Sequence, residues 1–237
     1  MIAEMNKALA FLTAKYGVPA GEISGSDGAY RVGGYPLLPW RIERRFVELK
    51  NLIANGTLEG VSTLRFSSMT AGGRLPEQVT RELDLAAWMT GSPVASLFAV
   101  CSGGAAANLV VKLANGVSVS VECGNKLPSG AETIDRHEII ARRGIASDRV
   151  VDTQVPQSSI YAFTGKGEER YTDTDAELFG LSSDEIGVVR AAFAVLADPA
   201  LGAEWTAAAA VMDELGKAVE KSDSTSSLIK LQGDAQK

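Results

Sequence analysis

The stretch NLVVKLANGVSVSVEC, residues 108–123, decides the fold class of this chain. Apolar and polar residues alternate on both sides of Asn115-Gly116, which is the pattern of strands that bury one face. Because both residues accept positive backbone φ angles, Asn-Gly between two such runs predicts a β-hairpin with a type I′ turn. The polar face of this hairpin carries Ser118, Ser120 and Glu122. We therefore expect an antiparallel sheet that is covered on one side only.

Helical and strand-like segments surround the hairpin. Further strands are expected at 61–68, 94–101, 137–143, 148–155 and 159–171, with a short edge strand at 228–231. Helical periodicity occurs at 1–16, 42–54, 182–198 and 203–221. Ser182 and Glu185 have the spacing of a capping box at the start of the third of these helices. The sequence thus predicts an α+β fold, with a large, mainly antiparallel open sheet and helices on one face.

Composition and charge narrow the classes of function. The chain is 46% apolar and has a formal net charge of -6, which disfavours nucleic acid as a partner because phosphate binding needs clustered cations. Arg41, Arg44 and Arg45 form a small basic cluster that we interpret as a solvated helix face. No run of about 18 apolar residues is present, and residues 1–12 do not resemble a secretory signal. We expect a soluble, cytoplasmic protein without a membrane partner.

Cysteine and histidine usage gives no metal signature. Cys101 and Cys123 lie in strand-like runs without CxxC spacing, so both are expected to be small buried hydrophobes. His137 is the single histidine, which excludes a histidine-rich metal centre within one chain. No metal site is therefore expected. Gly103 and Gly104 follow a strand-like run, but their spacing departs from the GxGxxG pattern that cradles a dinucleotide.

The segment GGRLPEQVTRELDLAAWMTG, residues 72–91, carries the candidate chemistry. Glu77, Arg81, Asp84 and Trp88 follow one another at spacings of four, three and four, so a helix would present them as one stripe. Taken alone, this pattern is explained by an exposed face with one Glu77–Arg81 ion pair, which is worth about 0.3–0.5 kcal/mol. Trp88 is then expected to be a core aromatic residue.

This segment resembles the motif GGGxLxDxGxHxxDxxxWxxG of the glucose-fructose oxidoreductase and inositol dehydrogenase family (Gfo/Idh/MocA), aligned on Leu75, Asp84, Trp88 and Gly91. The resemblance extends over about residues 30–231, and the first helix looks like the last helix of the family's Rossmann domain. It implies a dihydrodipicolinate-reductase-like C-terminal domain over 41–231. Residues 1–40 would then be a Rossmann remnant with a connector, and 232–237 a flexible tail.

The resemblance also implies which residues occupy the motif positions for catalysis: Glu77, Arg81 and Asp84. In the family, an aspartate and a histidine of the motif orient the substrate and move its hydroxyl proton, and Glu77 and Arg81 stand at those positions. Arginine stays protonated at accessible pH and cannot replace histidine as a general base. A nucleotide-binding half would precede the matched region, so the chain alone is expected to bind no cofactor, with NAD(P) bound only where a partner supplies a Rossmann domain.

Three functional hypotheses follow. The first is an oxidoreductase-like accessory or oligomerising subunit without dehydrogenase activity of its own, which forms a homodimer or pairs with a full-length relative through its sheet face. The second is the substrate domain of a split NAD(P)-dependent sugar or polyol dehydrogenase. The third is a cofactor-free binder or lyase for a small polar ligand, a carbohydrate or an acid, in which Arg81 would hold a carboxylate or phosphate.

Overall fold

The computed structural model describes residues 1–26, 28–148, 159–164, 167–172 and 180–231. The chain divides into two compact units, one formed by residues 1–46 with 173–211 and the other by residues 47–172 with 212–237. Each unit is therefore assembled from two separate stretches of sequence. The expected boundary near residue 40 stays a prediction, and the expected tail at 232–237 lies outside the described residues.

The first unit combines helices with a small sheet. Helix α1 (Ile2–Tyr16) ends at Gly17, whose φ of 68° is the left-handed cap expected there. A three-stranded antiparallel sheet of β1 (Ile23–Ser26), β2 (Ala29–Val32) and β3 (Tyr35–Pro36) follows. The 3-10 helix η1 (Pro39–Arg41) then leads to α2 (Arg44–Ala54), most of which belongs to the second unit. Helix α4 (Ser183–Ala197) packs on α1. Its predicted capping box is confirmed by the reciprocal hydrogen bonds of Ser182 and Glu185.

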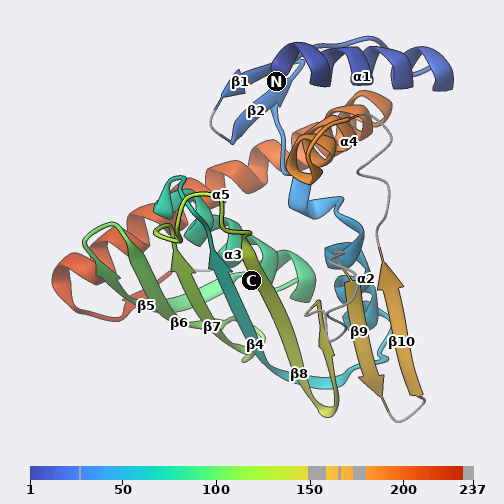
Figure 1. Cartoon of the computed structure of the whole chain (residues 1–237). Helices are drawn as coiled ribbons and strands as arrows, with labels where there is room; N and C mark the ends of the chain where they lie inside the picture. Colours follow the sequence, from blue (N-terminus) through green and yellow to red (C-terminus); the bar gives the residue numbers. More distant parts are fainter. Residues whose placement is uncertain (27, 149–158, 165–166, 173–179, 232–237) are drawn as a thin grey trace, which may run out of the picture. The chain divides into compact units, whose positions relative to one another are not determined.

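The second unit is built on an eight-stranded sheet with the order β10-β9-β8-β4-β7-β6-β5-β11. The strands are β4 (Glu59–Met69), β5 (Val94–Ser102), β6 (Ala106–Leu113), β7 (Ser118–Gly124), β8 (Ile134–Ser147), β9 (Ser159–Thr164), β10 (Gly167–Thr172) and β11 (Ile229–Lys230). Neighbouring strands are antiparallel except for β4 and β7, which run parallel. Helix α3 (Leu75–Thr90) packs against β7, β6 and β4 (Figure 1). The predicted α+β fold with a mainly antiparallel sheet is confirmed.

The hairpin of β6 and β7 is confirmed, but its predicted turn type is wrong. The two strands pair from Ala106↔Gly124 to Lys112↔Ser118. Gly116 has a φ of 89°, whereas Asn115 does not have a positive φ, so the two residues do not form a type I′ turn. The Asn115 side chain instead accepts a hydrogen bond from the Val117 backbone at 3.1 Å, and the Gly116 amide donates to Leu113 at 3.0 Å. Asparagine therefore serves here as a side-chain acceptor, with glycine supplying the left-handed residue.

The sheet has one buried face and one more open face. Its buried face is formed by alternate apolar residues that include Leu64, Phe66, Leu97, Leu109, Val111, Val119, Val121 and Ile139. The segment around Gly103-Gly104 is the turn between β5 and β6, so it does not lead into a helix as a dinucleotide fold requires. Most of the strand expected at 148–155 lies outside the described residues.

The remaining expected elements are found with small shifts of their ends. Helix α5 (Pro199–Thr225) is longer than expected, and the expected edge strand is present as β11, which pairs with β5. Among the described residues, no single helix has the length and apolar character of a membrane crossing. Helices α4 and α5, which are bent by 120° relative to each other, meet that criterion only as a pair, by length and composition.

Candidate functional site

Helix α3 brings charged side chains onto the buried face of the sheet. It starts after Gly73, carries Pro76 in its first turn and ends at Gly91 in the left-handed conformation, so its limits follow from local sequence. Two of its acidic residues, Glu82 and Asp84, are buried together with its apolar residues. Burial of a carboxylate is costly unless the charge is paired, so each of these residues requires partners inside the fold.

The structure separates the residues of the predicted stripe. Glu77 is half exposed and pairs with Arg74 at 2.9 Å, whereas Arg81 pairs with Asp135 and Glu82. Asp84 is buried, with 5% of its surface exposed. Trp88 is half-buried, and the ammonium of Lys50 lies 4.2 Å from the centre of its ring, so Trp88 is not the core residue that we expected. Glu77 and Asp84 therefore occupy different environments, and their roles in catalysis stay predictions.

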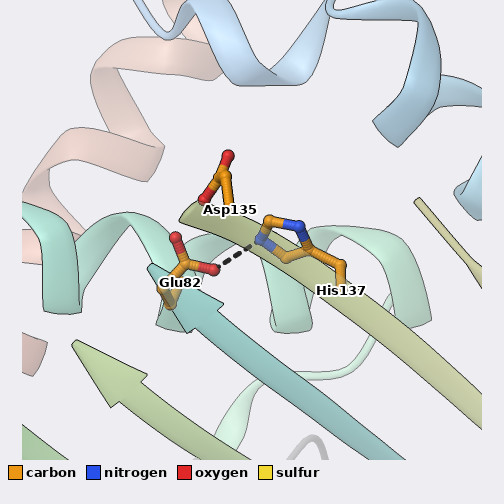
Figure 2. Close-up of side chains that lie close together, drawn as sticks. All are labelled: Glu82, Asp135 and His137. Atoms are coloured by element: carbon orange, nitrogen blue, oxygen red, sulfur yellow. Dashed lines mark hydrogen bonds and ion pairs between the residues drawn. The ribbon is translucent and has the colours of Figure 1, made fainter. Parts of the chain in front are cut away.

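Arg81 belongs instead to a buried ion cluster, which we define as Arg81, Glu82, Asp135, His137 and Asp148. Glu82 reaches the imidazole from α3, and Asp135 and His137 come from β8, as Figure 2 shows. His137 Nε2 lies 2.8 Å from Glu82 Oε2, and its Nδ1 lies 2.6 Å from Asp148 Oδ2. Arg81 Nη2 lies 2.5 Å from Asp135 Oδ2, and Arg81 Nε lies 3.5 Å from Glu82 Oε1.

The strand framework holds the imidazole of His137 in place. Its ring packs edge-on against Phe66, its register partner on β4, at a centroid distance of 4.7 Å. Asp148 holds the Nδ1 side of the ring. Its side chain accepts a hydrogen bond from the His137 backbone amide at 2.5 Å and also contacts Nδ1. The Asp148 backbone amide in turn donates to the His137 carbonyl at 3.1 Å. Asp148 thus determines the orientation of His137 through both its backbone and its side chain.

Electrostatics keep His137 protonated near neutral pH. Burial alone would lower the pKa of His137, but the carboxylates of Asp148, Glu82 and Asp135 outweigh burial and raise this pKa to about 10. A doubly protonated imidazole has no lone pair to accept a proton, so His137 in this state is not a general base at neutral pH. Burial, together with the negative charge of Glu82, also raises the pKa of the Cys123 thiol, which therefore stays protonated.

The cluster also has the composition of a cation site. One ligand atom each from Glu82, Asp135 and His137 can be chosen so that all three lie within 4.8 Å of one another. Sequence reasoning missed this grouping because the residues come from α3 and from β8, more than 50 positions apart. The sequence contains one weak indication of this grouping. Asp135 and His137 are two positions apart in a strand, so both point to the same face of the sheet.

Comparisons with known proteins identify the fold. No family model and no curated protein sequence matches the chain. Solved structures do: levoglucosan dehydrogenase in complex with NADH and levoglucosan has a TM-score of 0.63 at 14% identity, over 83% of this chain and 65% of that one. A myo-inositol 2-dehydrogenase from Lactobacillus plantarum has a TM-score of 0.58 at 14% identity, and the match covers 82% of this chain and 64% of that one. Over the matched region, this chain shares the fold of these structures.

A third structure gives the same result. A scyllo-inositol dehydrogenase from Lactobacillus casei, with bound NAD(H) and scyllo-inositol, has a TM-score of 0.57 at 15% identity, over 81% of this chain and 63% of that one. These neighbours are Gfo/Idh/MocA-type oxidoreductases, so the fold that the motif around α3 implied is confirmed. The chain spans only 61–66% of the length of the first such structures. At identities of 14–17% the likeness concerns the fold, and activity requires separate arguments.

Proposed function

We propose that this oxidoreductase-like chain is a non-catalytic subunit that associates with a second copy of itself through the open face of its large sheet. The observation that carries the proposal is the row of side chains on the open face of β5, β6, β7, β4 and β8. Strand register places Phe98, Val110, Ser120, Arg65 and Glu138 next to one another in this order. This face is apolar at one end of the row and charged at the other.

The apolar end is unusually exposed for a folded sheet. Val110 is 65% exposed and Val100, on the neighbouring strand β5, is 52% exposed. Two β-branched residues and Phe98 thus lie on one surface of adjacent strands. Contiguous exposed apolar side chains favour a protein interface over an ordinary solvated surface. A flat sheet face with such a centre suits packing against an identical face around a two-fold axis.

The charged end would give this association its orientation. Arg65 and Glu138 form an ion pair of 3.7 Å on the same face, with the arginine side chain 64% exposed. In an isologous interface each surface packs against its own copy in the partner. An ion pair such as Arg65–Glu138 has no net charge and can be buried there, whereas a single charge without a partner would destabilise the interface. The open face therefore combines an apolar area with a charge-balanced border.

The ion cluster supports the non-catalytic part of the proposal. Arg81 stands at the motif position of the family's histidine, and its guanidinium is engaged by Asp135 and Glu82. Arginine does not titrate near neutrality, so this motif position does not offer the proton acceptor that oxidation of a sugar hydroxyl needs.

The proposal is tested by the mass of the assembly and one surface substitution. Light scattering on a sizing column should give the mass of a dimer for the wild type. Val110→Asp should raise the dissociation constant at least about tenfold, because it would bury an unpaired carboxylate. Val211→Asp is the matched control, since Val211 is 56% exposed but lies on α5.

Two outcomes would contradict the proposal. A monomeric wild type at micromolar concentration would remove self-association. A dimer that Val110→Asp leaves intact would place the contact elsewhere. If the chain instead oxidised a sugar or polyol once a separate dinucleotide-binding polypeptide was added, the split-dehydrogenase hypothesis would replace the non-catalytic one.

A further inference from the structure

The strongest unassigned feature of the molecule is the buried ion cluster beneath α3. Its donor set is mixed, because Glu82 and Asp135 offer carboxylate oxygens and His137 offers an imidazole nitrogen. Imidazole with carboxylate ligands suits first-row divalent transition metal ions such as Zn²⁺. The Nε2 of His137 and the Oε2 of Glu82 are 2.8 Å apart, so the two donors already converge.

The surroundings of His137 match those of a metal-binding histidine. Metal-binding imidazoles donate their second ring N–H to a carboxylate or carbonyl, which fixes the tautomer and the ring direction. Asp148 Oδ2 accepts from the Nδ1 side at 2.6 Å, which leaves Nε2 directed toward Glu82. Asp148, the imidazole and the Glu82 carboxylate are therefore already aligned, and an ion bound between Nε2 and Glu82 would replace the proton that these two atoms share.

Buried polar atoms near the cluster provide a second, independent observation. Glu82 is completely buried, yet its Oε1 accepts no hydrogen bond from the described residues and lies 3.5 Å from the Arg81 Nε. Ser68 is also completely buried, and its Oγ makes no hydrogen bond with the described part of the chain. Ser68 pairs in register with Asp135 on β8 and lies on the face that α3 covers. Buried oxygens without a hydrogen bond from the protein can accept one from a water or coordinate an ion.

We propose that Glu82, Asp135 and His137 bind a divalent transition metal ion, with Asp148 as the residue that positions the imidazole. The guanidinium of Arg81 lies beside the carboxylates of Glu82 and Asp135 and would compete with the ion for them. Its side chain is 21% exposed and that of Asp135 is 12% exposed, so this is the side from which an ion would enter. The site would be structural, since its histidine is completely buried.

The test uses tag-free protein, treated with chelator and titrated with Zn²⁺ by calorimetry. We expect one ion per chain. Asp135→Asn should abolish binding, and Asp148→Asn should weaken it about 10–100-fold, the usual effect of removing a residue that orients a ligand. Asp213→Asn, at an exposed position on α5, is the matched control and should bind as the wild type does.

A gain of affinity provides the sharpest test. Arg81→Gln removes the competing cation and should tighten Zn²⁺ binding at least about tenfold. Lys217→Gln, which removes an exposed cation on α5, should not change it. Because His137 is the single histidine of the chain, the ¹⁵N NMR signals of its imidazole report on this site alone. Zn²⁺ should shift the Nε2 signal to that of a metal-bound nitrogen and leave Nδ1 protonated.

Several results would overturn the proposal: no binding at millimolar Zn²⁺, binding that Asp135→Asn leaves unchanged, an Arg81→Gln variant that binds no more tightly, or an unchanged Nε2 signal. The proposal is independent of self-association, because the cluster lies on the covered face and the association surface on the open face. A failure of one leaves the other in place.

Discussion

Replacement of His137 by phenylalanine should be among the most destabilising single changes in the sheet. Phenylalanine keeps the ring that packs edge-on against Phe66 at 4.7 Å, but it removes both N–H donors. Two buried carboxylates, Glu82 and Asp148, would then lose the cation between them. Leaving a buried charge without its partner costs roughly 3–5 kcal/mol. A pKa raised from 6.5 to about 10 corresponds to about 5 kcal/mol at most, which agrees with this range.

The assay is urea unfolding, followed by circular dichroism at pH 7 in the presence of a chelator. Glu214→Gln is the control, because it breaks an exposed ion pair of 2.6 Å with Lys217 on α5 and should cost less than about 1 kcal/mol. A loss below about 1 kcal/mol for His137→Phe would refute the reasoning. It would mean that the cluster is hydrated or that His137 is neutral in the folded protein.

The same cluster should make the free energy of unfolding depend on pH when a chelator is present. His137 has a higher pKa in the folded chain than in the unfolded one, so its contribution is complete below pH 6.5 and is lost as the pH rises toward about 10. The unfolding free energy of the wild type should therefore fall across this interval. His137→Phe should lack that decrease, and equal slopes for the two proteins would contradict the assignment.

Three further predictions concern the remaining candidate residues. Addition of the purified chain should leave NADH fluorescence unchanged, and saturable micromolar binding would contradict this. Trp205→Ala should cost roughly 3–5 kcal/mol because Trp205 is completely buried, whereas Trp88→Ala should cost less than half as much, as thermal unfolding of the two variants would show. Arg81→Ala should lower the free energy of unfolding by about 1–3 kcal/mol, since Arg81 bridges Asp135 and Glu82. An unchanged free energy of unfolding in urea would argue against those contacts.

Local patterns accounted for most of the fold. The strands around Asn115-Gly116, the cap at Gly17 and the capping box of Ser182 and Glu185 depend on residues only a few positions apart, so the sequence contains the whole interaction. The turn type was wrong because the Asn115 side chain accepts the Val117 amide, an alternative that the dipeptide pattern does not distinguish. The motif at 72–91 correctly indicated the fold that the solved structures share.

The site could not be predicted in the same way. Arg81 has Glu77 four residues earlier, which is the usual helical partner, but its partner in the structure is Asp135, 54 positions away. Such a choice depends on which face of α3 meets the sheet. Glu82 was overlooked because a carboxylate next to an arginine on a helix is ordinarily solvated. The pairing of β8 with β4 places His137 on the sheet face that α3 covers, and there its imidazole contacts Glu82.

The most direct test of the central claim is native mass spectrometry of the protein isolated from its own cells, because it reports partners and retained ligands together. The proposed function predicts a complex of two copies without a bound dinucleotide. A single copy that carries NAD(H) or NADP(H) would contradict it.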